Sequence, residues 1–266
     1  MAFNRSVSQT IICEEYMRKR TKAAVIALGA LLGSSLFGCA QAPTPTIPVD
    51  GSESHCVTYP LPEDGSTPLD HSGLENIGYM AGRLAASDNY HVEATSDVSA
   101  KIIIDYHQAV ETIKDYRDGV MVSTDISKSS LVNTASQVCF MDGNALMRRP
   151  KSSSASDWNG SDTEWKTETP LKYDYESYLP LYGLLGTEFS VYVINEETLL
   201  SASEVTALGD GLYSQTFSFD TELAAVYYRA RMKTMGGLAE LPDIHSIEAT
   251  YVFTEEWQVV SSVYTE

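Results

Sequence analysis

The sequence predicts an α+β fold in which one antiparallel sheet packs against a few helices. From residue 90 onward apolar and polar side chains alternate in runs, which is the period of strands that bury one face. Asp118-Gly119 and Asp142-Gly143 separate neighbouring runs, and such dipeptides favour the tight turns of β-hairpins. Two further segments repeat apolar residues at helical spacing. Residues 71–266 are long enough to form a single domain with a sizeable core.

The first half of this domain is predicted to be one helix followed by a meander of strands. The helix covers residues 70–87, because Asp70 or Ser72 can cap it and apolar residues then recur on one side. Alternation from residue 90 to the turn at 118–119 predicts long strands. Further strands, joined by tight turns, are predicted at 120–126, 136–141 and 144–148.

The second half is predicted to combine a polar loop, helical segments and more strands. The clearest helix covers residues 221–235, since Asp220 can cap its start and Gly236-Gly237 can end it. The other elements are a polar loop at 150–163, a short strand from residue 165, a helical segment at 173–185 bent at Pro180, a strand at 189–193, a hairpin at 199–219 turned at Gly209-Asp210-Gly211, and two closing strands.

The segment before this domain has the layout of a secretory signal. Basic residues at 18–22 precede an uncharged apolar stretch at 23–36, which is shorter than the roughly 20 residues that span a bilayer. The run Leu36-Phe37-Gly38-Cys39 resembles the lipobox of bacterial lipoproteins. That resemblance implies that residues 1–38 are removed, that Cys39 carries the lipid, and that the protein is extracytoplasmic and membrane-anchored, at the cell surface in a Gram-positive organism. An ordinary signal peptide with an incidental cysteine is the alternative.

Two further segments flank this signal. Residues 1–16 contain an acidic pair that such signals normally lack, so Met17 is the more natural start and we expect residues 1–16 to stand outside the fold. Residues 39–70 are rich in proline, which favours an extended tether rather than a packed core. Cys56 and Cys139 either form a disulfide in an oxidising exterior or remain free, and the sequence leaves both possibilities open.

The order of elements behind a lipid-modified N-terminus resembles the LolA/LppX-like lipoprotein carriers. The strings at 194–198 and 227–238 are also similar to strings in uncharacterised lipoproteins of Gram-positive bacteria. The carrier resemblance implies an incomplete, half-open antiparallel barrel curved around helices, with a cavity that accepts acyl chains. Apolar residues of the predicted strands are the candidates for lining that cavity, with ordinary core packing as the alternative for each: Ile102, Ile104, Tyr106, Phe189, Val191, Tyr251 and Phe253.

The sequence contains no motif of a known catalytic or metal site. Its five histidines lack HExxH or other metal-ligand spacing, and no GxSxG, Walker or GxGxxG loop occurs. Adjacent acidic residues such as Glu196-Glu197 point to opposite faces of a strand and make poor acid/base partners. The formal net charge of −18 repels a phosphate backbone. We therefore expect a non-enzymatic protein without a metal, a cofactor or a nucleic-acid partner.

The leading prediction is a lipid-anchored cell-envelope protein that binds an apolar or amphiphilic ligand in a half-barrel cavity. The first alternative is an envelope interaction or sensor module with a packed core and no ligand, and the second is an envelope hydrolase with a dispersed site. For the interaction module, Trp158 and Trp165 are the candidate partner contacts, although the same side chains can pin the loop 150–163 against the sheet. A hollow on the concave face of the sheet would favour the leading prediction, and a face filled by side chains would favour the first alternative.

Overall fold

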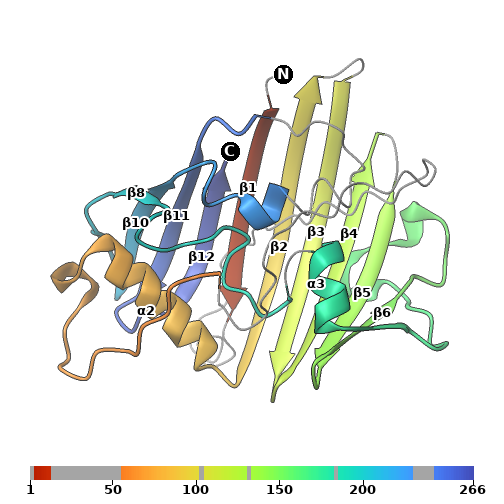
Figure 1. The fold of residues 1–266 in the computed structure, drawn as a ribbon, viewed down its shortest axis with the longest axis horizontal. Coiled ribbons are helices and arrows are strands. Elements are labelled where there is room, and N and C mark those ends of the chain that lie inside the picture. The colour runs from red at the N-terminus through yellow and green to blue at the C-terminus, as the bar shows by residue number, and fades with distance from the viewer. Residues whose placement is uncertain (1–2, 13–54, 102–104, 131–132, 183–184, 230–242) are drawn as a thin grey trace.

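The structure is a computed structural model that describes residues 3–12, 55–101, 105–130, 133–182, 185–229 and 243–266. These residues form one twelve-stranded antiparallel sheet with a few helices (Figure 1). The strands in spatial order are β7-β6-β5-β4-β3-β2-β1-β12-β11-β10-β8, with β9 also paired to β10. The two ends of this order do not pair with each other, so the sheet is open. The predicted α+β class with an open antiparallel sheet is confirmed.

The elements have the following bounds. The strands are β1 (Phe3–Ile12), β2 (Asn89–Lys101), β3 (Asp105–Arg117), β4 (Val120–Ser129), β5 (Thr134–Met141), β6 (Asn144–Arg148), β7 (Leu171–Asp174), β8 (Leu199–Ala202), β9 (Thr206–Gly209), β10 (Leu212–Phe219), β11 (Ile247–Thr254) and β12 (Val259–Thr265). The helices are η1 (Pro68–Asp70), α2 (Gly73–Ala85), η2 (Ala155–Asp157), η3 (Gly160–Asp162) and α3 (Tyr175–Tyr182).

Asp-Gly turns set the register of the meander β3–β6. Asp118 and Gly119 have φ angles of 50° and 83°, and Asp142 and Gly143 have 48° and 72°. Positive φ at both central residues matches the twist of flanking strands. Tyr116 therefore pairs with Met121, and Met141 pairs with Asn144. The two hairpins predicted from these dipeptides are confirmed.

The helices α2 and α3 lie on one face of the sheet, which we call the inner face. Figure 1 shows α2 over the β8–β10 end and α3 over the β5–β6 end. Ser72 caps α2 in a capping box with Glu75, so Ser72 rather than Asp70 begins the helix. Buried Asn76 of α2 donates to Gln215 Oε1 at 3.1 Å and accepts from the Trp257 indole at 2.9 Å. These bonds join α2 to β10 and to the turn before β12.

The segment at 55–59, predicted to belong to the tether, is packed into the fold. Cys56 forms a parallel bridge with Ile194, in which Val57 N–H donates to Ile194 O at 2.8 Å. Tyr59 N–H donates to Gly78 O at 3.0 Å, and a Cβ at Gly78 would lie 2.3 Å from the Tyr59 ring. The glycine therefore permits the close approach of this segment to α2. The part of the tether that the structure describes is docked rather than extended.

Three predicted elements differ from the structure. Residues 189–193 form no strand, because Ser190 and Tyr192 are buried as well as the apolar positions between them, and the segment crosses the inner face as a loop. Trp165 makes an isolated bridge to Pro150 instead of a strand. Residues 221–225 are turns and 226–229 are helical, while the rest of the predicted helix at 221–235 lies outside the described residues.

The predicted exclusion of residues 1–16 from the fold also differs from the structure. Phe3–Ile12 forms β1, which pairs antiparallel with β2 on one side and with β12 on the other (Figure 1, red). This strand contains Val7, Thr10, Ile11 and Ile12, which are residue types that favour strands.

Candidate functional site

The half of the inner face formed by β10–β12 is filled by side chains. Phe189 stacks on Tyr251 with ring centroids 5.6 Å apart, and Phe217 meets Tyr251 edge-on at 5.7 Å. Val191 and Phe253 belong to the same buried cluster. A pocket between α2, β2 and the start of β12 has a volume of about 10 Å³, which barely admits one water molecule. Four of the predicted cavity residues are therefore packed as core.

The three other predicted cavity residues lie on or next to β3. Ile102 and Ile104 lie outside the described residues. Tyr106 lies in β3, where it pairs with Ala100 of β2. The part of the chain that the structure describes thus gives no support to a cavity for an acyl chain.

A second region of the inner face is polar. Several positions of β2–β5 that face the helix side carry hydroxyl, amide or carboxylate groups, and apolar residues such as Val98 and Val110 lie between them. We call this set the polar band: Ser96, Gln108, Thr112, Asp125, Ser127, Thr134 and Ser136, all buried.

Strand register brings these residues together. Thr112 pairs with Asp125, and Asp125 pairs with Ser136, so one row crosses β3, β4 and β5. Ser96 lies in the next row, where Val110 pairs with it and with Ser127. Neighbouring strands are about 4.8 Å apart, so the band from β2 to β5 is roughly 14 Å wide.

Part of the polar band is internally hydrogen-bonded. Thr112 Oγ1 donates to Asp125 Oδ1 at 2.6 Å. Gln108 Nε2 donates to Ser127 Oγ, also at 2.6 Å. These two bonds hold the four side chains of β3 and β4 in fixed orientations. They use the hydroxyl proton of Thr112 and one of the two N–H groups of the Gln108 amide.

Three atoms of the band are buried without a hydrogen-bond partner among the described residues. They are Ser96 Oγ, Gln108 Oε1 and Ser136 Oγ, in side chains that are 2%, 4% and 0% exposed. A buried polar group left unpaired costs about 1–3 kcal/mol, and native proteins keep few of them. Three within one patch are an unusual concentration and mark the band as the candidate site.

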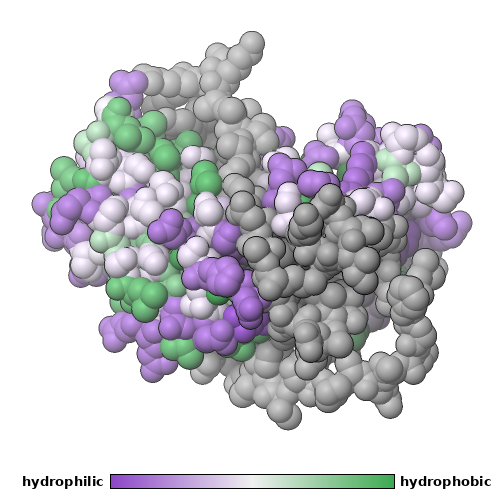
Figure 2. Space-filling model, turned by 90° about the horizontal axis from the view of Figure 1, so that it is seen from above, coloured by the Kyte–Doolittle hydropathy of each residue, from purple (hydrophilic) through white to green (hydrophobic). Residues whose placement is uncertain are grey.

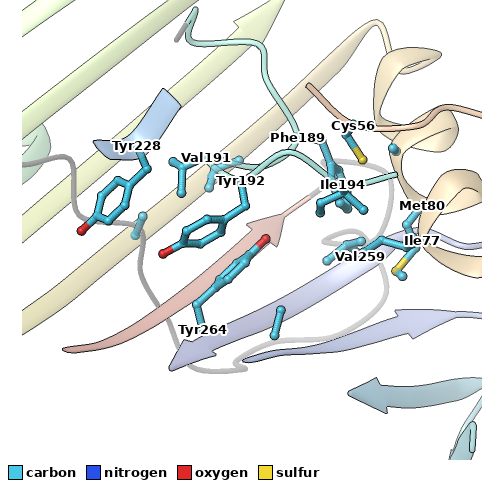
Figure 3. Packing of buried hydrophobic residues seen from close by; sticks show 14 of the residues in the cluster. Cys56, Ile77, Met80, Phe189, Val191, Tyr192, Ile194, Tyr228, Val259 and Tyr264 are labelled. Atoms are coloured by element: carbon cyan, nitrogen blue, oxygen red, sulfur yellow. The ribbon is translucent and has the colours of Figure 1, made fainter. Parts of the chain in front are cut away.

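A network of tyrosine hydroxyls adjoins the band across β1. Tyr264 Oη hydrogen-bonds Tyr251 Oη and donates to Ser190 Oγ at 3.4 Å. Tyr192 and Tyr228 donate to the Glu266 carboxylate. Figure 3 shows the side chains of Tyr192, Tyr228 and Tyr264 near one another, each from a different segment. Burial raises the pKa of Tyr264 to about 12, so the Tyr264 hydroxyl stays protonated at neutral pH and acts as a hydrogen-bond donor.

The loop at 150–163 packs against the opposite, outer face of the sheet. Trp158 is 7% exposed and joins Ile126 and Ala135 in a second apolar cluster, with Trp165 partly buried against it. The Trp158 indole donates to Ser152 O at 2.9 Å, and Lys128 Nζ donates to Trp158 O at 2.7 Å. The tryptophans therefore pin the loop to the sheet, which is the alternative role that the sequence allowed.

The described cysteines and histidines do not assemble a reactive centre. Cys139 is a free thiol, and burial raises the pKa of the Cys56 thiol, which makes it a poor nucleophile. His91 lies on the outer face, 2.6 Å from Asp115. Among the described residues no group of three or more His, Cys, Asp or Glu side chains is placed to hold a metal ion.

Apolar side chains are exposed at one edge of the sheet. Leu200 of β8 and Leu208 of β9 are 64% and 53% exposed. Figure 2 shows apolar patches on this side of the molecule. Both strands pair only with β10 among the described strands, which places them at an edge of the sheet.

Comparison of the chain with known protein families, with curated proteins and with solved structures finds no match. None of the helices described here has the length and apolar character needed to cross a bilayer. The fold and site thus define an open-sheet α+β protein with a polar band buried on its helix-covered face.

Proposed function

We propose that this chain is a lipid-anchored, extracytoplasmic binding protein without enzymatic activity, whose ligand contacts the polar band. The observation that carries the proposal is the set of unpaired atoms on Ser96, Gln108 and Ser136. These atoms have almost no accessible surface, so a ligand would reach them only when the band opens, and its hydrogen-bonding groups would then supply the partners that the atoms lack.

The position of the band changes where the predicted amphiphilic ligand is expected to bind. The apolar residues predicted to line a cavity pack against one another in the core: Phe189, Val191, Tyr251 and Phe253. We therefore place the polar part of the ligand on β2–β5 and propose no cavity for an acyl chain. An open antiparallel sheet with helices on one face also agrees with the carrier resemblance in its coarse outline, and that kinship remains part of the proposal.

The lipid anchor is tested by Cys39→Ser, with Cys139→Ser as the matched control. Cys139 lies in β5 and is a free thiol, so its substitution leaves any anchor intact. We expect Cys39→Ser alone to move the protein from the membrane fraction to the soluble fraction. Retention of this variant in the membrane would reject the anchor.

A mature chain that begins at lipidated Cys39 cannot contain β1. Cleavage before Cys39 would remove Phe3–Ile12 and with it the strand between β2 and β12. Intact mass of the membrane-extracted protein decides between them, because a mature chain starting at lipidated Cys39 has lost residues 1–38. A mass that includes residues 3–12 would contradict cleavage and retain β1.

Ligand binding is tested by native mass spectrometry of protein extracted from its own membrane. We expect an adduct on the wild type that is lost when Ser96 and Ser136 are both changed to alanine. Ser99→Ala is the matched control, because it makes the same change on the exposed, outer face of β2. Absence of any adduct from the wild type, or an adduct unchanged in the double variant, would reject the site.

The open edge at β8 and β9 favours a second candidate function, an envelope interaction module. Exposed leucines on strands that pair only with β10 among the described strands suit the addition of a strand from a protein partner. Leu200→Lys with Leu208→Lys should then abolish a cross-linked complex in cells while leaving the ligand adduct unchanged. A cross-linking pattern identical to that of the wild type would reject this surface.

A further inference from the structure

The strand β1 lies in the middle of the sheet, and the lipid anchor of the proposed function would remove it. It pairs with β2 over ten positions, Phe3 to Ile12, and with β12 over five. Cleavage before Cys39 would leave backbone N–H and C=O groups along one edge of each neighbour without partners. We propose that the mature protein fills this slot with an extended segment of another protein. The inference rests on the proposed function, because the anchor requires that cleavage.

Contacts on the inner face would hold the slot at the width of one strand. Lys114 Nζ of β3 donates to Gly186 O at 2.8 Å, and Phe189 stacks on Tyr251 of β11 with ring centroids 5.6 Å apart. The loop that contains Gly186 and Phe189 therefore joins the two halves of the sheet that β1 separates. Direct pairing of β2 with β12 would move these halves closer by one strand spacing, about 4.8 Å, and would break such contacts.

Neither the chain's own tether nor a second mature copy can supply the missing strand. A central strand needs N–H groups along both edges, which excludes proline, and the tether contains Pro43, Pro45 and Pro48. The proline-free residues that follow lead into the segment at 55–59, which is bound to Ile194 and to α2. A second mature copy has lost the same strand, and β7 and β8 at the ends of the described sheet have four residues each. The segment must therefore come from a different protein.

The residues of β2 beside the slot define the chemistry of the segment. On the inner face they are Val92, Ala94 and Val98, all buried. On the outer face Glu93 and Asp97 lie beside the slot, where they would pair with the incoming strand. Cross-strand pairs of opposite charge are favourable. The segment therefore has about ten residues without proline, runs antiparallel to β2 and β12, is apolar at alternate positions and is basic beside the two carboxylates.

Site-specific photo-cross-linking in cells tests where the segment lies and which protein supplies it. Thr95 of β2 and Val263 of β12 both pair with Ser8 of β1 and are exposed, so a photoreactive residue at either position would flank the slot. Lys172 is the matched control, because it is exposed on β7 at the far end of the sheet. We expect positions 95 and 263 to cross-link to neighbouring residues of one segment in another protein, and position 172 to give no such product.

Other cross-linked products would contradict the proposal. A cross-link from position 95 to β12 of the same chain would show that the slot has closed. Cross-links to the cleaved residues 1–38 would identify the chain's own leader as the occupant, and cross-links to a second copy would identify a dimer. Each of these results, or no cross-link from either position, would overturn the inference.

A labelled peptide of residues 1–14 measures the size of the effect, because it contains the strand that fits the slot. The mature protein is released from its partner in urea and refolded with the peptide. We expect binding that Val7→Pro weakens at least about a hundredfold, since proline removes a donor from a central strand. A peptide with Ser6→Lys and Thr10→Lys should bind about tenfold more tightly than one with glutamate at both positions. No binding by the unmodified peptide, or equal binding of the proline variant, would overturn the inference.

These outcomes are distinct from failure of the proposed function. An intact mass that includes residues 3–12 would reject the anchor and leave no slot to fill. A mass that begins at lipidated Cys39, together with position 95 cross-linked to β12 of the same chain, would retain the anchor and reject the partner segment.

Discussion

Replacing Ser136 with alanine should make the protein more stable, which is the reverse of the usual effect of a core substitution. The Ser136 side chain is fully buried and its Oγ has no partner among the described residues. Burying an unpaired hydroxyl costs about 1–3 kcal/mol, so its removal should raise the free energy of unfolding by about 1 kcal/mol after allowance for the small void left behind.

Ser127→Ala is the matched comparison on the neighbouring strand. Ser127 Oγ accepts from Gln108 Nε2 at 2.6 Å, and its loss would leave both ends of the Gln108 amide unpaired. We expect the free energy of unfolding to fall by about 1–3 kcal/mol. The two variants should therefore differ by at least about 2 kcal/mol, or roughly 4–8 °C in melting temperature for a domain of this size.

Urea denaturation followed by tryptophan fluorescence, on ligand-free protein, measures both variants against the wild type. Ser99→Ala on the outer face should stay within about 0.5 kcal/mol of the wild type. If Ser136→Ala and Ser127→Ala lose stability to the same extent, the Ser136 hydroxyl has a partner, and the reasoning that makes the band a binding site is wrong.

Two further predictions concern the docked segment at 55–59. Burial lowers the pKa of His55, whose ring stacks on Tyr227 at 3.9 Å, so the unfolded chain takes up a proton below about pH 6.5 that the folded protein does not. Melting temperature should consequently fall from pH 7 to pH 5 in the wild type and less steeply in His55→Phe, whereas His245→Gln at an exposed position should keep the wild-type slope; equal slopes for all three would exclude His55 as the cause. Gly82→Ala should lower the free energy of unfolding by about 1–3 kcal/mol in urea titrations, because its Cβ would lie 2.0 Å from Tyr59 O; a value unchanged from wild type would show that the segment does not rest on α2.

The hairpins of the sheet were predictable because local chemistry determines them. Asp-Gly dipeptides adopt positive φ at low cost, and they stand where β3–β4 and β5–β6 turn. The segment at 189–193 was not predictable in the same way. Alternation indicates a strand only when one face is solvated, and here Ser190 and Tyr192 are buried through contacts with residues distant in sequence.

The polar band was missed, although the sequence contained a signal for it. Gln108 alternates in phase with Val110 and so occupies a buried position of a predicted strand. Ser96, Asp125 and Ser136 require the cross-strand register before they can be seen as one group. A polar residue at a position where the alternation predicts a buried apolar one is the sequence signal for such a band. The aromatic and aliphatic residues predicted to line a cavity lie instead in the part of the sheet that packs as core.

The predicted anchor and the polar band are connected through β1. Val7 of β1 pairs with Tyr264 of β12 on one side and with Ser96 of β2 on the other, so one row contains the tyrosine network, β1 and the start of the band. Because β1 is antiparallel to both neighbours, β2 and β12 run parallel to each other. Removal of β1 by cleavage before Cys39 would leave Tyr264 and Ser96 facing each other across the vacated position. Cleavage would therefore separate the tyrosine network from the band by two strand spacings, about 10 Å, and would remove the backbone partners of both β2 and β12.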